Sequence, residues 1–277
     1  MTTPKTIRLQ CRDQILTSHT SGLAPAYLQA NLLILPAAYA EDFSRLCRRN
    51  PVPCPLLAVT DGTPKKLNNG ILVDSSSEQG FDIRTDFPRY HIYNKGKLQT
   101  KSNDCVEEWK DGHVGFLIGC SYSFESALVN AGVPPKNLLL GRNVSMFKTN
   151  KLMDPAGIFV NCPYVVSMRP YRKEFIPKVR EVTAKYDLTH GEPIDWGFDG
   201  AARLGIENVA APDYGDPIEL EDGEVPVFWG CGVTPQLAVE MVGHLIEGQV
   251  ISHAPGSMLV LDVTYDELRE YANNSIV

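Results

Sequence analysis

Short apolar runs that end in small residues are the clearest pattern along this chain, and one of them organises the rest. Residues 114–118 form an apolar run of the kind that a buried strand needs. Gly119, Cys120 and Ser121 follow, and apolar residues then recur at helical spacing over residues 124–131 until Gly132. The pattern predicts a strand that leads through a tight turn into a helix.

The same plan returns near the end of the chain. The apolar residues 225–229 precede Gly230, Cys231 and Gly232, and residues 233–242 have a helical pattern. A strand that meets a helix through small residues points backbone N–H groups and a positive dipole end at the turn. Both Gly-Cys turns are therefore suited to binding an anion such as a carboxylate.

The remaining pattern predicts further elements on both sides of these turns. We expect strands at residues 26–36, 56–60, 158–168 and 258–263, a strand end at 138–143, a hairpin at 90–98, and helices at 37–50, 105–109, 173–186, 201–205 and 266–272. The predicted fold class is α/β, with a main α/β sheet domain (residues 1–141 and 222–277) and a smaller inserted α+β domain (residues 142–221). The chain is expected to return to the main sheet at Val225.

Composition excludes some classes of function. The chain has 277 residues, is 43% hydrophobic and carries a net charge of −7, which argues against a nucleic-acid partner. No apolar run approaches the roughly 20 residues of a membrane span, so we expect no membrane partner. The N-terminus lacks a signal-peptide core, and we expect the cytoplasm. Three basic residues before Asp13 are a weak feature of a mitochondrial presequence. A homodimer is typical of a soluble enzyme of this size.

Cysteine and histidine spacing gives no sign of a cofactor. The seven cysteines form no CxxC pair, and the six histidines form no HxH or HExxH pattern. Glycine-rich nucleotide loops are absent from the sequence as well. We therefore predict no metal, no cofactor and no disulfide.

Several motifs resemble one family along nearly the whole chain. They are YLQANL (27–32), DIRTD (82–86), FLIGCSYSFE (116–125), NVSM (143–146), VVSMRP (165–170), FWGCGVTPQ (228–236) and HAPG (253–256). They resemble the D-glutamate cyclase-like family, whose members are also described as hydro-lyases and were once a domain of unknown function. Two positions depart from the family pattern: Asp195 stands where a histidine is usual, and Gly197-Phe198-Asp199 replaces Gly-Asp-Pro.

The resemblance implies a two-domain α/β and α+β fold. It also implies removal of water from a small amino-acid-like carboxylate, as when D-glutamate closes to 5-oxo-D-proline. The departures at residues 195 and 197–199 would change the substrate if either segment touches it.

Two cysteines are the first candidates for acid and base chemistry. A thiol at a helix N-terminus has a lowered pKa, so Cys120 and Cys231 are expected to reach the thiolate near neutral pH. A pair of such thiols facing one cavity is similar to the two-cysteine racemases, which makes racemase-like proton transfer an alternative function. The alternative for both residues is that they are small side chains that fill tight turns.

Two further residues are candidates for moving protons. Glu125 is an acid on an otherwise apolar helix face, which suits either a general acid/base or a helix-dipole charge or salt bridge. His253 precedes a Pro-Gly turn, where it would either shuttle protons or serve as a hydrogen-bonded structural histidine.

The candidate substrate-binding residues are cations and small polar side chains. Arginine grips carboxylate in a bidentate manner, so Arg84 and Arg169 are candidate clamps, with an internal ion pair such as Arg84–Asp86 as the alternative. The other candidates, each with capping or turn formation as its alternative, are Ser121, Ser123, Asn143 and Thr234.

We therefore expect a lyase of the hydro-lyase class with its site between the two domains, where the strands that carry Cys120 and Cys231 end. The alternative from another class is a non-catalytic module that binds a carboxylate or amino acid.

Overall fold

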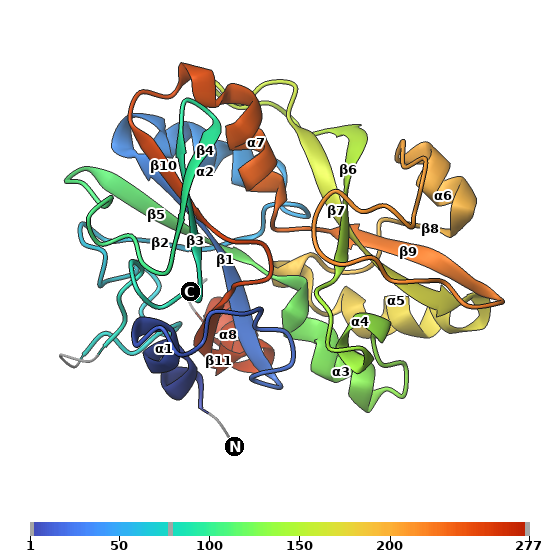
Figure 1. Ribbon diagram of the computed structural model, residues 1–277. Coiled ribbons are helices and arrows are strands. Elements are labelled where there is room, and N and C mark those ends of the chain that lie inside the picture. The colour runs from blue at the N-terminus through green and yellow to red at the C-terminus, as the bar shows by residue number, and fades with distance from the viewer. Residues whose placement is uncertain (1–2, 77–79, 275–277) are drawn as a thin grey trace.

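Two antiparallel sheets with helices packed around them form the protein, an α/β fold (Figure 1). The structure is a computed structural model, and it describes residues 3–76 and 80–274. Every strand pair in both sheets is antiparallel. Among the residues described, no helix combines the length and hydropathy needed to cross a bilayer.

The larger sheet has seven strands in the order β2-β5-β1-β10-β3-β4, with β11 paired to β1. Its strands are β1 (Tyr27–Pro36), β2 (Leu56–Val59), β3 (Tyr90–Asn94), β4 (Lys97–Ser102), β5 (His113–Gly119), β10 (Gln249–His253) and β11 (Leu259–Thr264). Strand β1 is at its centre and is buried along nearly its whole length. The predicted strands at 26–36, 56–60 and 258–263 and the hairpin at 90–98 are thus confirmed.

The smaller sheet has four strands in the order β6-β7-β9-β8. Its strands are β6 (Ser145–Leu152), β7 (Pro163–Arg172), β8 (Asp195–Trp196) and β9 (Glu224–Gly230). The expectation that Val225 returns the chain to the main sheet is wrong, because β9 pairs with β7 from Glu224 to Gly230. An apolar strand carries no local mark of the sheet it will join, so the sequence placed it in the wrong one.

Eight α-helices and five 3₁₀ turns are found in the described residues. They are α1 (Pro4–Arg12), α2 (Ala40–Arg49), α3 (Glu125–Asn130), α4 (Lys136–Leu139), α5 (Ile176–Ala184), α6 (Gly197–Arg203), α7 (Thr234–Val242), α8 (Tyr265–Asn274), η1 (Ala37–Tyr39), η2 (Ser121–Phe124), η3 (Lys173–Phe175), η4 (Asp187–Thr189) and η5 (Gly243–Leu245).

Two predicted elements are wrong. The strand end expected at 138–143 is the short helix α4, which follows Pro135 as its N-cap residue. The helix expected at 105–109 is a single turn, in which Trp109 N–H donates to the Cys105 carbonyl at 3.0 Å.

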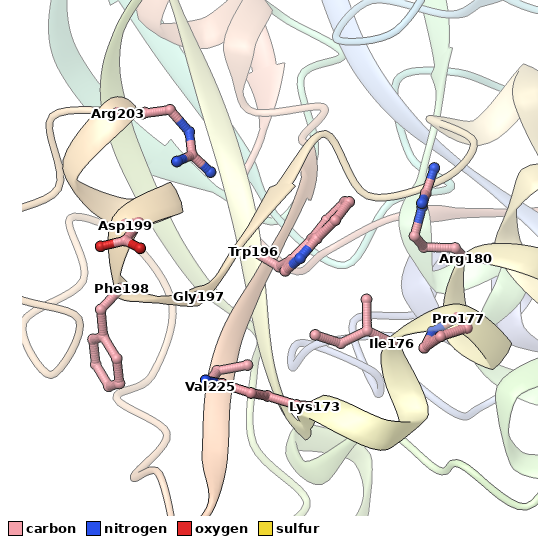
Figure 2. Close-up of a pocket in the computed structure, with 10 residues that line it drawn as sticks. All are labelled: Lys173, Ile176, Pro177, Arg180, Trp196, Gly197, Phe198, Asp199, Arg203 and Val225. Carbon is pink, nitrogen blue, oxygen red and sulfur yellow. The ribbon is translucent and has the colours of Figure 1, made fainter.

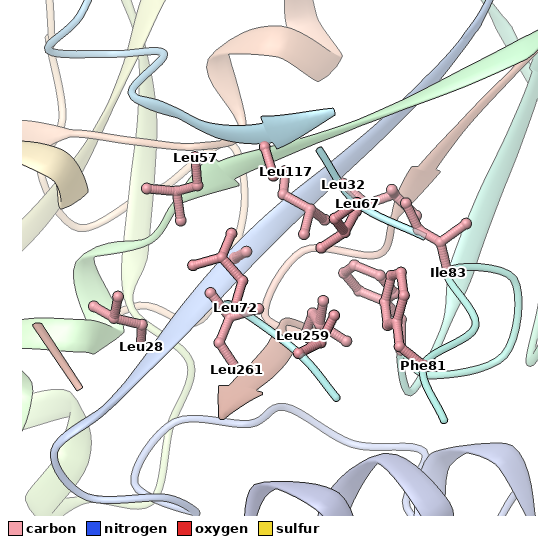
Figure 3. Packing of buried hydrophobic residues seen from close by; sticks show 14 of the residues in the cluster. Leu28, Leu32, Leu57, Leu67, Leu72, Phe81, Ile83, Leu117, Leu259 and Leu261 are labelled. Atoms are coloured by element: carbon pink, nitrogen blue, oxygen red, sulfur yellow. The ribbon is translucent and has the colours of Figure 1, made fainter. Parts of the chain in front are cut away.

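The hydrophobic core divides between the two sheets. One face of the large sheet buries a leucine-rich cluster that includes Leu28, Leu32, Leu117 and Leu259 (Figure 3). The opposite face packs against α2 and α7, and the small sheet has a core of its own around Trp229.

The chain passes from one sheet to the other at each Gly-Cys turn. Strand β5 belongs to the large sheet, but η2 and α3 behind it pack with β7, β9 and α5 of the small sheet. Strand β9 belongs to the small sheet, but α7 behind it packs onto the large sheet. Cys120 and Cys231 therefore lie at the two crossing points between the sheets.

Candidate functional site

The two Gly-Cys turns meet in space around one small cavity. It is lined by Asn31, Cys120, Ser121, Tyr122, Val144, Met146, Cys231, Gly232, Val233, Gly256 and Met258, and we call it the thiol cavity. Its volume is about 10 Å³. Roughly 10–15 Å³ is needed for a single water, so a substrate enters only if the lining side chains move.

The first turn is shaped by what surrounds it. A Cβ at Gly119 would lie 2.2 Å from the Leu188 carbonyl oxygen, so only glycine fits where β5 ends. The Cys120 sulfur then caps η2 by accepting from Tyr122 N–H at 3.5 Å. Ser123 Oγ accepts from Gln29 N–H of β1 at 3.0 Å, which ties the turn to the large sheet.

The second turn is built in a similar way. Gly230 is the last paired residue of β9, and a Cβ there would lie 2.9 Å from the Val52 carbonyl oxygen. Thr234 Oγ1 accepts from Val165 N–H of β7 at 3.0 Å and donates to the Cys231 carbonyl at 2.7 Å. Ser123 and Thr234 thus bond to neighbouring strands and do not cap a helix, as their alternative supposed, and neither lines the thiol cavity.

Both thiols are buried, and this overturns the expected thiolate. Burial raises the pKa of Cys120, and the nearby Cys231 and Glu125 raise it further. Burial also raises the pKa of Cys231, to about 11. The helix N-terminus does not compensate for the loss of solvent, so both groups are neutral thiols at neutral pH.

Arg169 and Glu125 form a buried ion pair behind the first turn. Arg169 Nη2 donates to Glu125 Oε1 at 3.1 Å, and both side chains are almost fully buried. Glu125 also accepts from Ser21 and Asn137. The pair occupies the Glu125 carboxylate and one arm of the Arg169 guanidinium, while Arg169 Nε is buried without a hydrogen-bond partner among the described residues.

Arg169 nevertheless reaches the thiol cavity through Ser121. Its Nη2 donates to Ser121 Oγ at 3.2 Å, and Ser121 lines the cavity. Because that hydroxyl oxygen accepts from a cation, its own hydrogen is directed elsewhere and can serve a ligand in the cavity. Arg169 thus positions the Ser121 hydroxyl as a donor, but Arg169 itself does not line the cavity.

Asn143 lies outside the lining of the thiol cavity, where it joins Tyr122 to the loop at residues 254–256. Its Oδ1 accepts from the Tyr122 hydroxyl, and its Nδ2 donates to the Pro255 carbonyl at 3.4 Å. A Cβ at Gly256 would lie 2.6 Å from Asn143 Nδ2, which shows how tightly this loop packs. Asn143 is therefore beside the site, where it holds Tyr122.

Two predicted site residues lie elsewhere. Arg84 makes a bidentate pair with Asp82, at 2.9 and 2.7 Å, and not with Asp86 as its alternative supposed. His253 Nδ1 accepts from Leu32 N–H at 3.1 Å, and burial lowers its pKa to about 3. The structure gives both a structural role, because each has its partner in the scaffold and neither lines the thiol cavity.

Sequence reasoning missed Asn31 as a site residue. Asn31 lines the cavity, and its Nδ2 donates to the Gly119 carbonyl at 2.8 Å, just before Cys120. A Cβ at Gly232 would lie 1.8 Å from the same nitrogen, so Asn31 fits between the two turns. A polar residue, two positions after Gln29, in a strand that is otherwise largely apolar was the available signal.

A larger groove of about 670 Å³ opens between α5 and α6 (Figure 2). It is lined by Lys173, Ile176, Pro177, Arg180, Trp196, Gly197, Phe198, Asp199, Arg203 and Val225. Its two arginines are paired, Arg180 with Glu192 and Arg203 with Asp195. No thiol lines this groove, so the chemistry expected of Cys120 and Cys231 is not located there. Within the described ranges, no three His, Cys, Asp or Glu side chains gather as a metal site.

Known proteins are similar to this chain in sequence. Residues 114–262, which span both Gly-Cys turns, match the family model described as D-glutamate cyclase. Three relatives are each named "Putative hydro-lyase". The one from Bacillus subtilis is 44% identical over 96% of this chain and 98% of its own length. That from Rubrobacter xylanophilus is 48% identical over 88% and 89%. That from Schizosaccharomyces pombe is 43% identical over 96% and 86%.

Proposed function

Because the chain belongs to the D-glutamate cyclase family, we propose that it is a lyase that removes water from a small amino-acid-like carboxylate. The reaction we propose is ring closure of the type that converts D-glutamate to 5-oxo-D-proline. The observation that carries the proposal is the single cavity that both Cys120 and Cys231 line. Two proton carriers that face one space are what a dehydrating ring closure needs.

The two neutral thiols balance the proton transfers of this reaction. In ring closure, the amine nitrogen bonds to the distal carboxyl carbon, and one C–O bond of that carboxyl breaks. The ammonium loses two protons, and the departing oxygen gains two and leaves as water. Each thiol gives one proton to the oxygen and regains one from the nitrogen. The first of these exchanges precedes the attack, because the ammonium nitrogen has no free lone pair until a thiolate has taken one of its protons.

The surrounding groups would hold the substrate in place. The Ser121 hydroxyl, aimed by Arg169, donates to a substrate carboxylate, and the Asn31 side chain lies between the two turns. Backbone N–H groups at the start of α7 add a positive dipole end. Glu125 keeps Arg169 in position, and Asn143 does the same for Tyr122.

The proposal is tested by proton NMR in deuterated water. The protein is incubated with D- and L-glutamate and with 2- and 3-hydroxy acids. Ring or alkene signals support the proposal, whereas exchange of the α-proton without product supports racemase-like transfer. Cys120→Ser and Cys231→Ser should each lower turnover by roughly 10²–10⁴-fold, as loss of a general acid/base does. The matched control is Cys105→Ser, since Cys105 is buried away from the thiol cavity.

A non-catalytic binding module is the second candidate, and the neutral state of both thiols favours it. Such a module needs the shape of the site but no proton transfer. If a small acid binds equally to the wild type and both serine variants, and none of the three turns it over, the binding role replaces the catalytic one.

A further inference from the structure

A second cavity lies next to the thiol cavity. It has a volume of about 290 Å³ and is lined by Gly22, Ala24, Pro25, Ala26, Gln29, Tyr122, Glu125, Ser126, Val129, Asn130 and Leu138. We call it the outer cavity. Several of its lining residues are exposed, Val129 among them, so it opens to solvent.

Tyr122 separates the two cavities. Of the described residues it alone lines both. Its side chain is buried, and its hydroxyl donates to Asn143 Oδ1. On the inner side its hydrophobic neighbours include Met146 and Met258, which are flexible side chains that can repack when a ring moves.

We propose that the outer cavity is the access route and outer subsite for the ligand of the thiol cavity, and that Tyr122 is the movable partition between them. This inference rests on the proposed function in one respect, namely that a small acid is what passes. Rotation of the Tyr122 ring breaks its hydrogen bond to Asn143 and joins the two spaces. The thiols are then reached from solvent through the outer cavity.

The size of the joined space limits the ligand. The two cavities together offer about 300 Å³. That is the lower end of the roughly 300–1,000 Å³ of ligand pockets, which suits a compact acid and excludes a nucleotide or an oligopeptide. Neither cavity has Lys, Arg or His among the described residues that line it, but the carboxylate of Glu125 lines the outer cavity, whereas Ser121, which accepts from Arg169, lines the thiol cavity. The anionic end of the ligand therefore belongs at the turns, beyond Tyr122.

Cysteine alkylation measures this access directly. The full-length protein is treated with iodoacetamide at a fixed alkaline pH, and peptide mass spectrometry follows each cysteine over time. Tyr122→Ala should raise the alkylation rates of Cys120 and Cys231 at least tenfold. The rates of Cys54 and Cys105 should not change, because these buried residues line neither cavity. Tyr171→Ala is the matched control, because Tyr171 is also buried with one hydroxyl bond, to the Val133 carbonyl.

A second variant leaves Tyr122 in place and should change the alkylation rates of Cys120 and Cys231 in the opposite direction. Val129 lies on α3 at the outer cavity and is 42% exposed, so a larger side chain there is tolerated by the fold. Val129→Trp should fill the outer cavity and slow alkylation of Cys120 and Cys231 several-fold, with Cys54 and Cys105 as internal controls. If Tyr122→Ala raises all four rates together, the Val129→Trp result decides: a slower rate supports the route, and an unchanged rate overturns it.

Alkylation of Cys120 and Cys231 at wild-type rates in both variants overturns the inference. Because the measurement uses neither substrate nor turnover, it is independent of the proposed reaction. Turnover that is observed while both variants leave alkylation unchanged would retain the function and discard the route. If both variants change the alkylation rates as expected but no acid is turned over, the access route is retained and the proposed function is discarded.

Discussion

The two Gly-Cys turns share several features, although their cysteines are 111 positions apart in the sequence. Before each cysteine stands a glycine whose Cβ position meets a backbone carbonyl, at 2.2 Å for Gly119 and 2.9 Å for Gly230. Three residues after each cysteine stands a hydroxyl, Ser123 or Thr234, that accepts from the backbone N–H of a neighbouring strand. A glycine before the cysteine and a hydroxyl three residues after it therefore occur at both places where the chain crosses between the sheets.

The turns differ at the fifth residue after the cysteine. At the first turn this residue is Glu125, paired with Arg169. At the second it is Gln236, whose Nε2 donates to the His253 carbonyl at 2.7 Å. Both turns nevertheless close with the same kind of backbone bond, in which the N–H of Ser123 or Thr234 donates to the carbonyl of the cysteine three residues earlier, so this bond does not require the charge. The charge instead bears on the thiol, because Glu125 raises the pKa of Cys120, after the larger effects of burial and Cys231.

The largest expected effect on stability comes from replacing Glu125 of the first turn with glutamine, the residue that the second turn has at the equivalent position. Glu125→Gln leaves Arg169 buried without its carboxylate, which costs about 3–5 kcal/mol in the free energy of unfolding. Urea denaturation at pH 7 measures the loss.

The control removes the charges of both residues of the pair. Glu125→Gln combined with Arg169→Met buries no unpaired charge, so it should be more stable than Glu125→Gln alone. A single variant within about 1 kcal/mol of wild type would mean that Arg169 finds another partner, and the contrast between the turns would lose its energetic basis.

The two glycines before the cysteines should differ in their tolerance of alanine. Gly119→Ala drives a Cβ against the Leu188 carbonyl oxygen at 2.2 Å, a contact that requires backbone movement. We expect a loss near the upper end of about 1–3 kcal/mol, and a smaller one for Gly230→Ala at 2.9 Å. Gly70→Ala is the matched control, because nothing lies within 4 Å of its Cβ position. Thermal unfolding ranks the three variants, and an equal effect at Gly119 and Gly70 would contradict the packing argument.

Local pattern was enough to predict the turns and not enough to predict their surroundings. Apolar runs and small residues indicated β5 and β9 and the helices that follow, since these signals are carried by neighbouring residues. The sheet that β9 joins depends on pairing with β7, about 60 residues earlier, which no local pattern encodes. The apolar residues 138–140 were ambiguous between strand and helix, and the Pro135 N-cap decided for α4.

The candidate site was predicted in its centre and not at its edges. Cys120, Cys231 and Ser121 line one cavity, as two facing turns require. Arg84 was indistinguishable from a clamp in sequence, because a salt bridge to Asp82 and a ligand contact use the same side chain. The burial of both thiols, and with it their neutral state, comes from packing by residues distant in the chain.

The pH dependence of stability should reveal the buried thiol of the second turn. The folded-state pKa of Cys231 is raised from 9.0 to about 11, so the folded protein keeps this proton where the unfolded chain has lost it. Stability from this group is complete below pH 9 and is lost as the pH rises through 11. At about 1.4 kcal/mol per pKa unit, the loss is about 3 kcal/mol. Cys231→Ala should flatten the curve of unfolding free energy between these values, and a slope identical to wild type would contradict the assigned burial.

The smallest expected effects concern the two hydroxyls, which should be equivalent if the turns are the same structure. Ser123→Ala removes the acceptor of Gln29 N–H, and Thr234→Val removes the acceptor of Val165 N–H. Each strand N–H is then buried without a partner, so each variant should lose about 1 kcal/mol, at the lower end of the cost of an unpaired buried group. Amide hydrogen exchange distinguishes them, because Ser123→Ala should expose β1 of the large sheet and Thr234→Val should expose β7 of the small sheet. The Ser123 hydroxyl bonds the first turn to the large sheet, and the Thr234 hydroxyl bonds the second turn to the small sheet. Loss of protection in the same sheet for both variants would contradict this assignment.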